Sequence, residues 1–116
     1  MLEIRNREEF NRALLSNEVV FVQYYSSINN KFDFIREVIK RLCETIDPRI
    51  LVLSINIDES PELARDTDAL PCFRVYYNGK MVFEQIDFFY QLDLDLSVLR
   101  RGIRSVFNSL NVNYRV

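Results

Sequence analysis

The sequence has 116 residues, a net charge of −2, 48% apolar residues, two cysteines and no histidine. This length and apolar content predict one domain spanning residues 1–116, and they argue against a disordered chain. The near-neutral charge gives no reason to expect nucleic acid as a partner, and the lack of histidine excludes Ser-His-Asp and Cys-His catalysis within one chain.

The first predicted elements are a short helix and a buried strand. Asn6 and Glu9 form a capping-box-like start for a helix that ends near Asn17. Residues 19–25 are β-branched, aromatic and mostly apolar, which predicts a buried strand. A polar loop over residues 26–30 follows, and a corner of this kind is where α/β proteins commonly place functional groups.

A second helix and a second strand come next. Residues 31–46 carry apolar side chains on one helical face, and Asp47-Pro48 ends this helix. Residues 50–57 are almost continuously apolar, as expected for a strand that is covered on both faces. Ser60 as a cap and Pro61 at the first helical position predict a short third helix.

The C-terminal half begins with a hairpin. Residues 72–77 and 80–86 are predicted strands joined by Asn78-Gly79, the favoured pair for a tight turn. An aromatic and acidic connector, a last helix and a tail follow, at residues 87–95, 96–110 and 111–116.

This order of elements predicts an α/β protein. The first two strands are joined through a helix and should lie parallel, whereas the two hairpin strands must be antiparallel. One mixed sheet of four to five strands, with helices on both faces, accounts for all of the elements.

The most specific part of the pattern is Asp68-Ala69-Leu70-Pro71, followed by a β run and Asn78-Gly79-Lys80. Together with the order of elements, it resembles the thioredoxin fold over residues 6–110. The resemblance implies a cis peptide bond between Leu70 and Pro71, lying against the active-site loop.

The same resemblance assigns Asn29 and Phe32 to the two positions of the thioredoxin Cys-x-x-Cys pair. Gln23 takes the position of the buried acid, and Ile28 that of the aromatic residue before the motif. Disulfide exchange needs an attacking thiolate and a resolving thiol, and neither an amide nor a phenyl ring supplies one. The resemblance therefore implies a thioredoxin fold that is redox-inactive.

Within thioredoxin-like proteins, the chain is similar to the thioredoxin-type domains of the phosducin-like group. The similarity lies in residues 17–20, in residues 55–61 and in the long connector after the hairpin. It implies a protein that binds other proteins, such as chaperonin or G-protein βγ subunits, as a chaperone or assembly cofactor.

Two surfaces are candidates for binding another protein or an extended peptide segment. The first is the groove between Ile28-Asn29-Asn30-Lys31 and Leu70-Pro71, where backbone groups beside the proline pair with an extended chain. The second is Phe88-Phe89-Tyr90, since a loop has little core in which to bury three rings. The alternative is that these rings cover the sheet edge or lie under the last helix.

Cys72 offers an alternative function. Next to Pro71, it is a candidate for the reactive thiol of a divergent single-cysteine oxidoreductase or a glutathione-handling protein. The other interpretation is a small buried hydrophobe, because no neighbouring positive charge is evident that would lower the pKa of its thiol. Cys43 is expected at the edge of the core.

Two groups of charged residues predict hydrated surfaces rather than sites. Arg100, Arg101 and Arg104 cluster on the expected solvent face of the last helix. Asp87, Asp93 and Asp95 lack the glycine-bearing spacing of a calcium loop, and no residue pattern points to a metal or to another cofactor.

The sequence also predicts a compartment. No apolar run approaches the roughly 20 residues that span a bilayer, so no membrane contact is expected. The first six residues lack the apolar segment and the cleavage site of a signal peptide. Two cysteines are too few for a disulfide scaffold, which fits a reducing, cytoplasmic setting.

Overall fold

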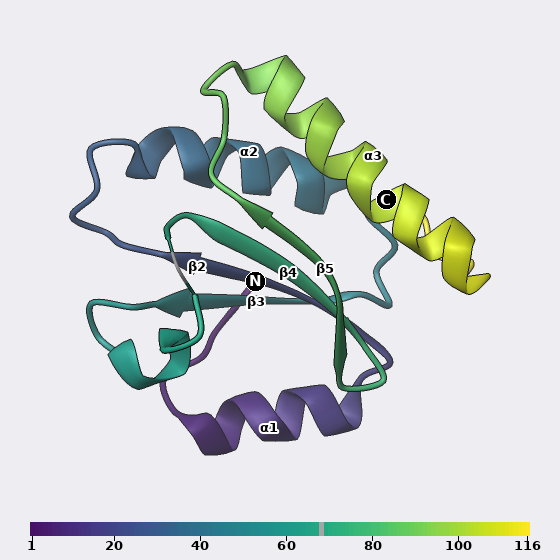
Figure 1. Ribbon diagram of the computed structural model, residues 1–116, viewed down its shortest axis with the longest axis horizontal. Coiled ribbons are helices and arrows are strands. Elements are labelled where there is room, and N and C mark those ends of the chain that lie inside the picture. Colours follow the sequence, from purple (N-terminus) through teal and green to yellow (C-terminus); the bar gives the residue numbers. More distant parts are fainter. Residues whose placement is uncertain (68) are drawn as a thin grey trace.

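A mixed five-stranded sheet runs through the centre of the molecule, in the order β1-β3-β2-β4-β5 (Figure 1). This computed structural model describes residues 1–67 and 69–116, so Asp68 of the predicted motif at 68–71 lies outside the described residues. In chain order the elements are β1 (Leu2–Glu3), α1 (Arg7–Ser16), β2 (Val19–Tyr25), α2 (Phe32–Thr45), β3 (Leu51–Asn56), the 3-10 helix η1 (Pro61–Ala64), β4 (Cys72–Tyr77), β5 (Lys80–Ile86) and α3 (Leu92–Leu110).

The strand pairing confirms the predicted mixed sheet. β2 and β3 are parallel, and β4 and β5 are antiparallel around the turn at Asn78 and Gly79. Both turn residues have positive φ, 51° and 80°, which is why an Asn-Gly pair suits this hairpin. β1 was not predicted, because only Leu2 and Glu3 form it, beside β3.

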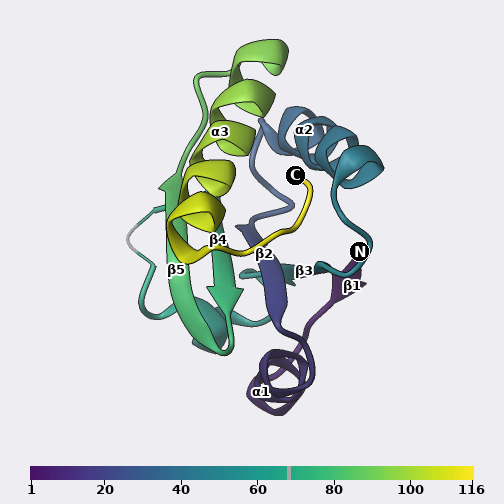
Figure 2. The same ribbon diagram turned by 90° about the vertical axis from the view of Figure 1, so that its right-hand side faces the viewer.

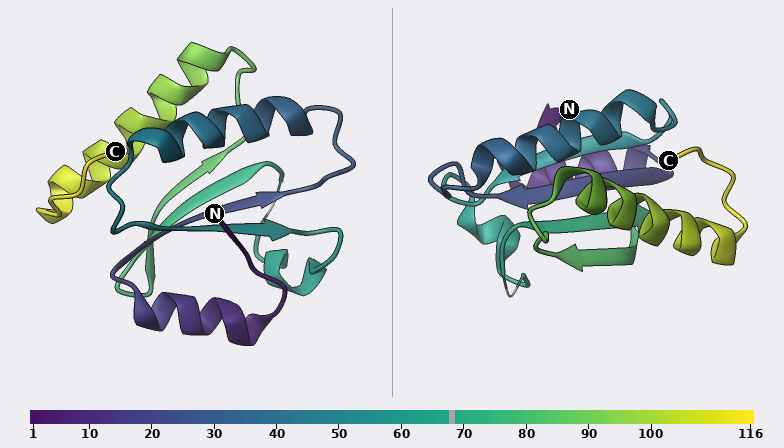
Figure 3. Two further views of the ribbon diagram at one scale, coloured as in Figure 1. Left: turned by 180° about the vertical axis from the view of Figure 1, so that it is seen from behind. Right: turned by 90° about the horizontal axis from the view of Figure 1, so that it is seen from above.

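Helices cover both faces of the sheet (Figure 2, Figure 3). α2 and α3 lie side by side on one face, and α1 lies with η1 on the other. Alternation along β2 directs Val19 and Phe21 to the first face and Val20 and Val22 to the second, so each face has its own apolar core. Within the described part of the chain, no helix has both the length and the apolar character to cross a membrane.

The helix starts follow the predicted signals in part. The Asn6 side chain caps α1 by accepting a hydrogen bond from the Glu9 N–H at 2.9 Å. Ser60 makes no side-chain cap on η1, because its hydroxyl donates to the Arg5 carbonyl at 2.8 Å instead. α3 begins at Leu92 rather than at Leu96, so the connector after the hairpin covers only residues 87–91.

Residues 111–116, predicted as a tail, fold back onto the α2–α3 layer. The Val116 side chain is buried in the core of that layer. The Asp47 N–H donates a hydrogen bond to the Arg115 carbonyl at 2.6 Å, which ties the segment to the loop after α2.

The arginines of α3 are not a purely hydrated face, contrary to the prediction. Arg104 donates two hydrogen bonds to the Val116 carbonyl, at 3.0 and 2.6 Å. Arg100 donates to the Arg41 carbonyl and to the Thr45 hydroxyl, both on α2. These side chains therefore hold neighbouring segments to α3.

Candidate functional site

The strand directions bring four connections to one end of the sheet. β2 and β3 are parallel, so residues 26–31 and 57–60 leave the sheet at the same end. Cys72 at the start of β4 lies opposite both Tyr24 and Ile86, so residues 69–71 and 87–91 lie at that end as well. We call these four connections the rim, and α2 and α3 begin beside it (Figure 1).

Contacts join the rim segments to one another. The Ser26 hydroxyl donates to the Asp58 carboxylate at 2.8 Å, which links the segments after β2 and β3. The Lys31 ammonium lies 4.5 Å from the centre of the Tyr90 ring, a cation–π contact that links the β2–α2 loop to the connector after β5. These contacts, together with a hydrogen bond from the Asp87 N–H to the Pro71 carbonyl, link all four connections of the rim.

The first predicted binding segment is largely exposed. Ile28 is 85% exposed, and Asn30 and Lys31 are exposed as well. Asn29 is half-buried, and its side-chain oxygen accepts a hydrogen bond from the Lys31 N–H at 2.8 Å. Ile28 is therefore accessible to a partner, while Asn29 shapes the loop.

The segment before β4 is less accessible than predicted. Pro71 is buried and Leu70 half-buried, and the peptide bond between them is cis. The Pro71 carbonyl accepts a hydrogen bond at 2.8 Å from the Asp87 N–H. One lone pair of this carbonyl is therefore taken by the connector after β5, and the pairing of backbone groups here with an extended chain stays a prediction.

The connector divides its three aromatic rings between core and solvent. Phe88 is buried and stacks on Phe73, with the ring centres 4.6 Å apart. Tyr90 is half-buried against Phe34, with the ring centres 5.4 Å apart. Phe89 is 67% exposed. The prediction of an exposed binding residue is thus wrong for Phe88, and Phe89 is the ring of this run that faces the solvent.

A buried carboxylate fixes the shape of the connector. Asp95 is completely buried, and it accepts hydrogen bonds from the N–H groups of Phe89, Tyr90 and Gln91 at 2.7, 2.7 and 3.0 Å. It lies near the N-terminus of α3, where the helix dipole favours negative charge. The prediction of a solvated acidic stretch is wrong for Asp95, because the earlier start of α3 turns this side chain back toward the connector.

Two connector residues adopt left-handed backbone conformations. The φ angles of Asp87 and Tyr90 are 68° and 69°. Such conformations are unfavourable for residues other than glycine and persist only where the surroundings hold them. Here the Tyr90 hydroxyl donates to the Asp87 carboxylate, and burial together with that carboxylate raises the pKa of Tyr90 to about 12.

A buried guanidinium supports the other side of the rim. Arg74 on β4 is 2% exposed, and it donates to Glu84 on β5 at 2.8 Å and to Asp66 at 3.1 Å. One of its nitrogens also lies 3.5 Å from the Tyr24 hydroxyl on β2. Because Asp66 follows η1, this ion pair anchors the segment of chain that leads toward Pro71.

The two cysteines lie apart and away from the rim surface. Cys72 is completely buried on the α1 face of the sheet, and Cys43 is half-buried on the α2–α3 face. Burial raises the pKa of the Cys72 thiol to about 11, although Arg74 acts in the opposite direction. The expectation that no positive charge lies near Cys72 is therefore wrong, but burial outweighs that charge.

The remaining positions implied for redox groups hold an aromatic ring and an amide. Phe32 begins α2 and stacks on Tyr25, with the ring centres 5.5 Å apart. Gln23 is buried, and its amide donates to the Ser54 hydroxyl at 3.1 Å. These side chains pack and form hydrogen bonds, and neither is a nucleophile or an acid at neutral pH.

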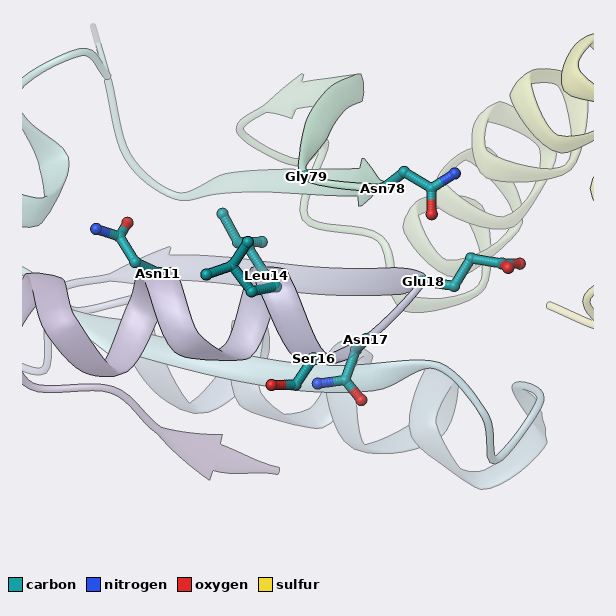
Figure 4. A pocket seen from close by; sticks show the side chains of 8 residues that line it. Asn11, Leu14, Ser16, Asn17, Glu18, Asn78 and Gly79 are labelled. Atoms are coloured by element: carbon teal, nitrogen blue, oxygen red, sulfur yellow. The ribbon is translucent and has the colours of Figure 1, made fainter.

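An open groove lies at the opposite end of the sheet (Figure 4). Asn11 and Leu14 project from α1 toward the strand that carries Asn78. The Asn78 N–H donates to the Glu18 carbonyl at 2.8 Å, which ties the hairpin turn to the chain before β2. Glu18 is the one titratable residue among those that line the groove, so the rim remains the better candidate site.

Comparisons with known proteins agree with this architecture. The family model described as Thioredoxin matches residues 1–93. Mitochondrial thioredoxin 3 from Saccharomyces cerevisiae has a similar structure, with a TM-score of 0.75 and 18% identity, covering 90% of this chain and 94% of that chain. Thioredoxin from Trypanosoma brucei brucei gives a TM-score of 0.75 at 17% identity, covering 93% of this chain and 91% of that chain.

A third similar structure comes from work on the thiol resolving mechanism in yeast mitochondrial 1-Cys peroxiredoxin. It has a TM-score of 0.75 and 18% identity, covering 90% of this chain and 94% of that chain. No curated protein sequence matches the chain. At these identities the similar structures show a shared thioredoxin fold, and they confirm the predicted fold class.

Proposed function

The chain belongs to the thioredoxin family, and from this premise we propose that it is a protein-binding module without disulfide-exchange activity. In this proposal the rim takes up an extended segment of another protein. The contact involves Ile28 and Phe89, with Asn30 and Lys31 beside them. No cofactor, nucleic acid or membrane takes part.

The contrast between exposed apolar side chains and buried sulfur carries this proposal. Ile28 is 85% and Phe89 67% exposed at the rim, whereas Cys72 is completely buried. Large apolar side chains on a fixed surface suit protein contacts. Thiol exchange, in contrast, needs an accessible thiolate, and burial raises the pKa of Cys72 to about 11.

The test combines an activity assay with a capture assay. Insulin reduction by dithiothreitol should run at its uncatalysed rate when this protein is added, with an active thioredoxin as the positive control. The immobilised protein should capture a partner from a lysate of its source organism, and Ile28→Ser combined with Phe89→Ser should abolish that capture. Catalysed insulin reduction would contradict the proposal.

Two variants serve as controls for the capture assay. Cys72→Ser should keep the partner, because the proposal gives this thiol no role. Leu15→Ser also removes an exposed apolar side chain, 88% exposed and outside the rim, and should keep the partner as well. Capture that survives the double substitution at the rim would assign the contact to another surface.

Thiol chemistry at Cys72 is the second candidate function, as a divergent single-cysteine oxidoreductase or a glutathione-handling protein. The observation that favours it is the likeness to structures described as thioredoxins and to one from work on peroxiredoxin thiol resolving. It requires Cys72 to become accessible, because the thiol is covered and lies 3.7 Å from the Glu84 carboxylate. A mixed disulfide of glutathione with Cys72, found in the native protein by mass spectrometry, would favour this function.

The main proposal extends to the role of the protein and to its location in the cell. A role as a chaperone or assembly cofactor like the phosducin-like proteins rests on residues 17–20 and 55–61. A reducing, cytoplasmic location rests on two cysteines that lie on opposite faces of the sheet. Chaperonin subunits or G-protein βγ subunits among the captured proteins would support the chaperone or assembly role.

A further inference from the structure

We infer that the partner segment is basic as well as apolar, with lysine or arginine side chains flanking an apolar anchor. This inference rests on the proposed function, because it describes the partner of the same rim. It comes from the distribution of charge around Ile28 and Phe89.

Acidic residues are concentrated in the rim segments that carry Ile28 and Phe89. The rim and the first helical residues beside it, 26–33, 57–60, 69–71 and 87–93, contain one lysine and five acidic residues: Asp33, Asp58, Glu59, Asp87 and Asp93. The formal charge of these segments is −4, whereas the whole chain carries −2, so the remaining residues carry +2. The protein is therefore electrostatically polarised, with its negative end at the rim.

These negative charges are not neutralised within residues 1–67 and 69–116. All five acidic side chains are exposed, and none of them forms an ion pair with another described residue. Lys31 holds its ammonium on the face of the Tyr90 ring. Arg36, the next basic residue along α2, lies over the Phe32 ring.

Local interactions account for where the carboxylates lie. Asp58 accepts a hydrogen bond from the Ser26 hydroxyl, and Asp87 accepts one from the Phe88 N–H at 2.8 Å. Asp33 and Asp93 lie in the first turns of α2 and α3, where helix dipoles favour acidic side chains. The hydrogen bonds position Asp58 and Asp87, and all of these carboxylates keep their charge exposed to solvent.

Exposed apolar side chains that share the rim with unpaired negative charges select among partners. The charges attract cationic segments and repel acidic ones, and the effect is strongest on the rate of association. Ile28 and Phe89 supply apolar contact area. The acidic side chains orient the partner segment and discriminate between basic and acidic segments. An extended segment with basic residues on both sides of one or two apolar side chains satisfies both requirements.

Labelled synthetic peptides test the inference. Three peptides of about 12 residues share a central Leu-Phe pair and are flanked by lysine, glutamine or glutamate, and binding is followed by fluorescence anisotropy. At low salt the lysine peptide should bind about tenfold tighter than the glutamine peptide, and the glutamate peptide should bind most weakly. At about 0.5 M salt the advantage of the lysine peptide should fall to about twofold, because the charges are screened.

Substitutions of the acidic residues in the protein test the same inference without changing the peptide. Asp58→Asn, Glu59→Gln and Asp87→Asn combined retain the side-chain oxygens that accept hydrogen bonds. This variant should bind the lysine peptide about tenfold more weakly and the glutamine peptide unchanged. A matched control neutralises three exposed acids outside the rim, Glu8→Gln, Glu18→Gln and Glu44→Gln, and should bind both peptides as the wild type does.

A lysine peptide with Ser-Ser in place of Leu-Phe should lose most of its affinity, because charge alone supplies no anchor. Equal affinity for the lysine and glutamine peptides would overturn this inference and leave the proposed function intact. If none of the Leu-Phe peptides binds, and Ile28→Ser with Phe89→Ser still captures the natural partner, the proposed function fails together with the inference.

Discussion

Asp95, which is completely buried, accepts a hydrogen bond at 2.7 Å from the backbone N–H of Phe89, whose ring is 67% exposed. A buried charge of α3 thus holds the backbone that carries an exposed ring of the rim. The backbone beneath this ring has little freedom left to lose when a partner covers the ring, which favours binding.

Asp95→Asn should loosen the connector. The amide has one acceptor oxygen where the carboxylate has two, so a buried N–H loses its partner, and the free energy of unfolding should fall by about 1–3 kcal/mol. Urea unfolding measures the loss, and hydrogen exchange should accelerate at one or more of Phe89, Tyr90 and Gln91, the three residues whose N–H groups donate hydrogen bonds to Asp95. Asp93→Asn, which changes an exposed acid of the same helix, should stay within about 0.5 kcal/mol of the wild type. Matching stabilities for the two variants would remove Asp95 from this role.

Arg74 should tolerate the loss of one carboxylate partner and not of both. Asp66→Asn or Glu84→Gln alone should lower the free energy of unfolding by about 1 kcal/mol, because the other carboxylate still neutralises the guanidinium. The double variant leaves a buried charge unpaired and should lose about 3–5 kcal/mol. Urea unfolding of the four proteins in this cycle measures the coupling.

The control for this cycle pairs Asp66→Asn with Glu8→Gln. Glu8 forms an exposed ion pair with Arg12 on α1 and does not contact Arg74. These two substitutions should therefore add to within about 0.5 kcal/mol. An additive result for Asp66 and Glu84 as well would mean that neither carboxylate compensates for the loss of the other at the guanidinium.

Cys72 should react slowly in the native protein. Its thiol is covered and its pKa is raised to about 11, so it stays protonated near pH 8. Ellman's reagent should modify Cys43 faster than Cys72, and a Cys43→Ser variant should show only the slow phase until urea is added. A fast native phase in that variant would support the thiol-based function instead.

The raised pKa of Cys72 also predicts a pH dependence. The unfolded chain releases the thiol proton near pH 8.5, below the folded value of about 11. The stability linked to Cys72 is therefore complete below about pH 8.5 and is lost as the pH rises toward 11. Cys72→Ser should show a shallower decline of the free energy of unfolding over this range.

Gly102→Ala should destabilise the contact between α3 and β5. A Cβ atom at this position would lie 2.6 Å from the Phe83 ring. The clash should lower the free energy of unfolding by about 1–2 kcal/mol net, even though alanine favours a helix interior by up to about 1 kcal/mol. In a Phe83→Leu background the same change should be neutral or stabilising. Destabilisation that persists there would assign the effect to something other than this ring.

The framework of the fold was predictable because its signals are local. The apolar runs that become β2 and β4, the Asn6 cap and the Asn78-Gly79 turn are each encoded within a few neighbouring residues, and the structure confirms them. β1 was missed because two residues, Leu2 and Glu3, are too few to form a pattern.

The supports of the rim were not predictable in the same way. Asp95 and Arg74 are charged, and a charged side chain is assigned to solvent unless its partner is known. The partners of Asp95 are N–H groups four to six residues earlier, which it reaches because α3 begins at Leu92, and the partners of Arg74 are carboxylates on two other segments. The left-handed residues Asp87 and Tyr90 flank Phe88 and Phe89 in a stretch without glycine, so the usual sequence signal for such a backbone is absent there.

The sheet that separates Cys43 from Cys72 determines which disulfide forms when the protein is oxidised. An internal bridge needs the two α-carbons within a few ångströms, and two side chains on opposite faces of one sheet cannot meet without unfolding. Oxidation during storage should therefore join two molecules through the more accessible Cys43, giving a covalent dimer that a reductant dissolves.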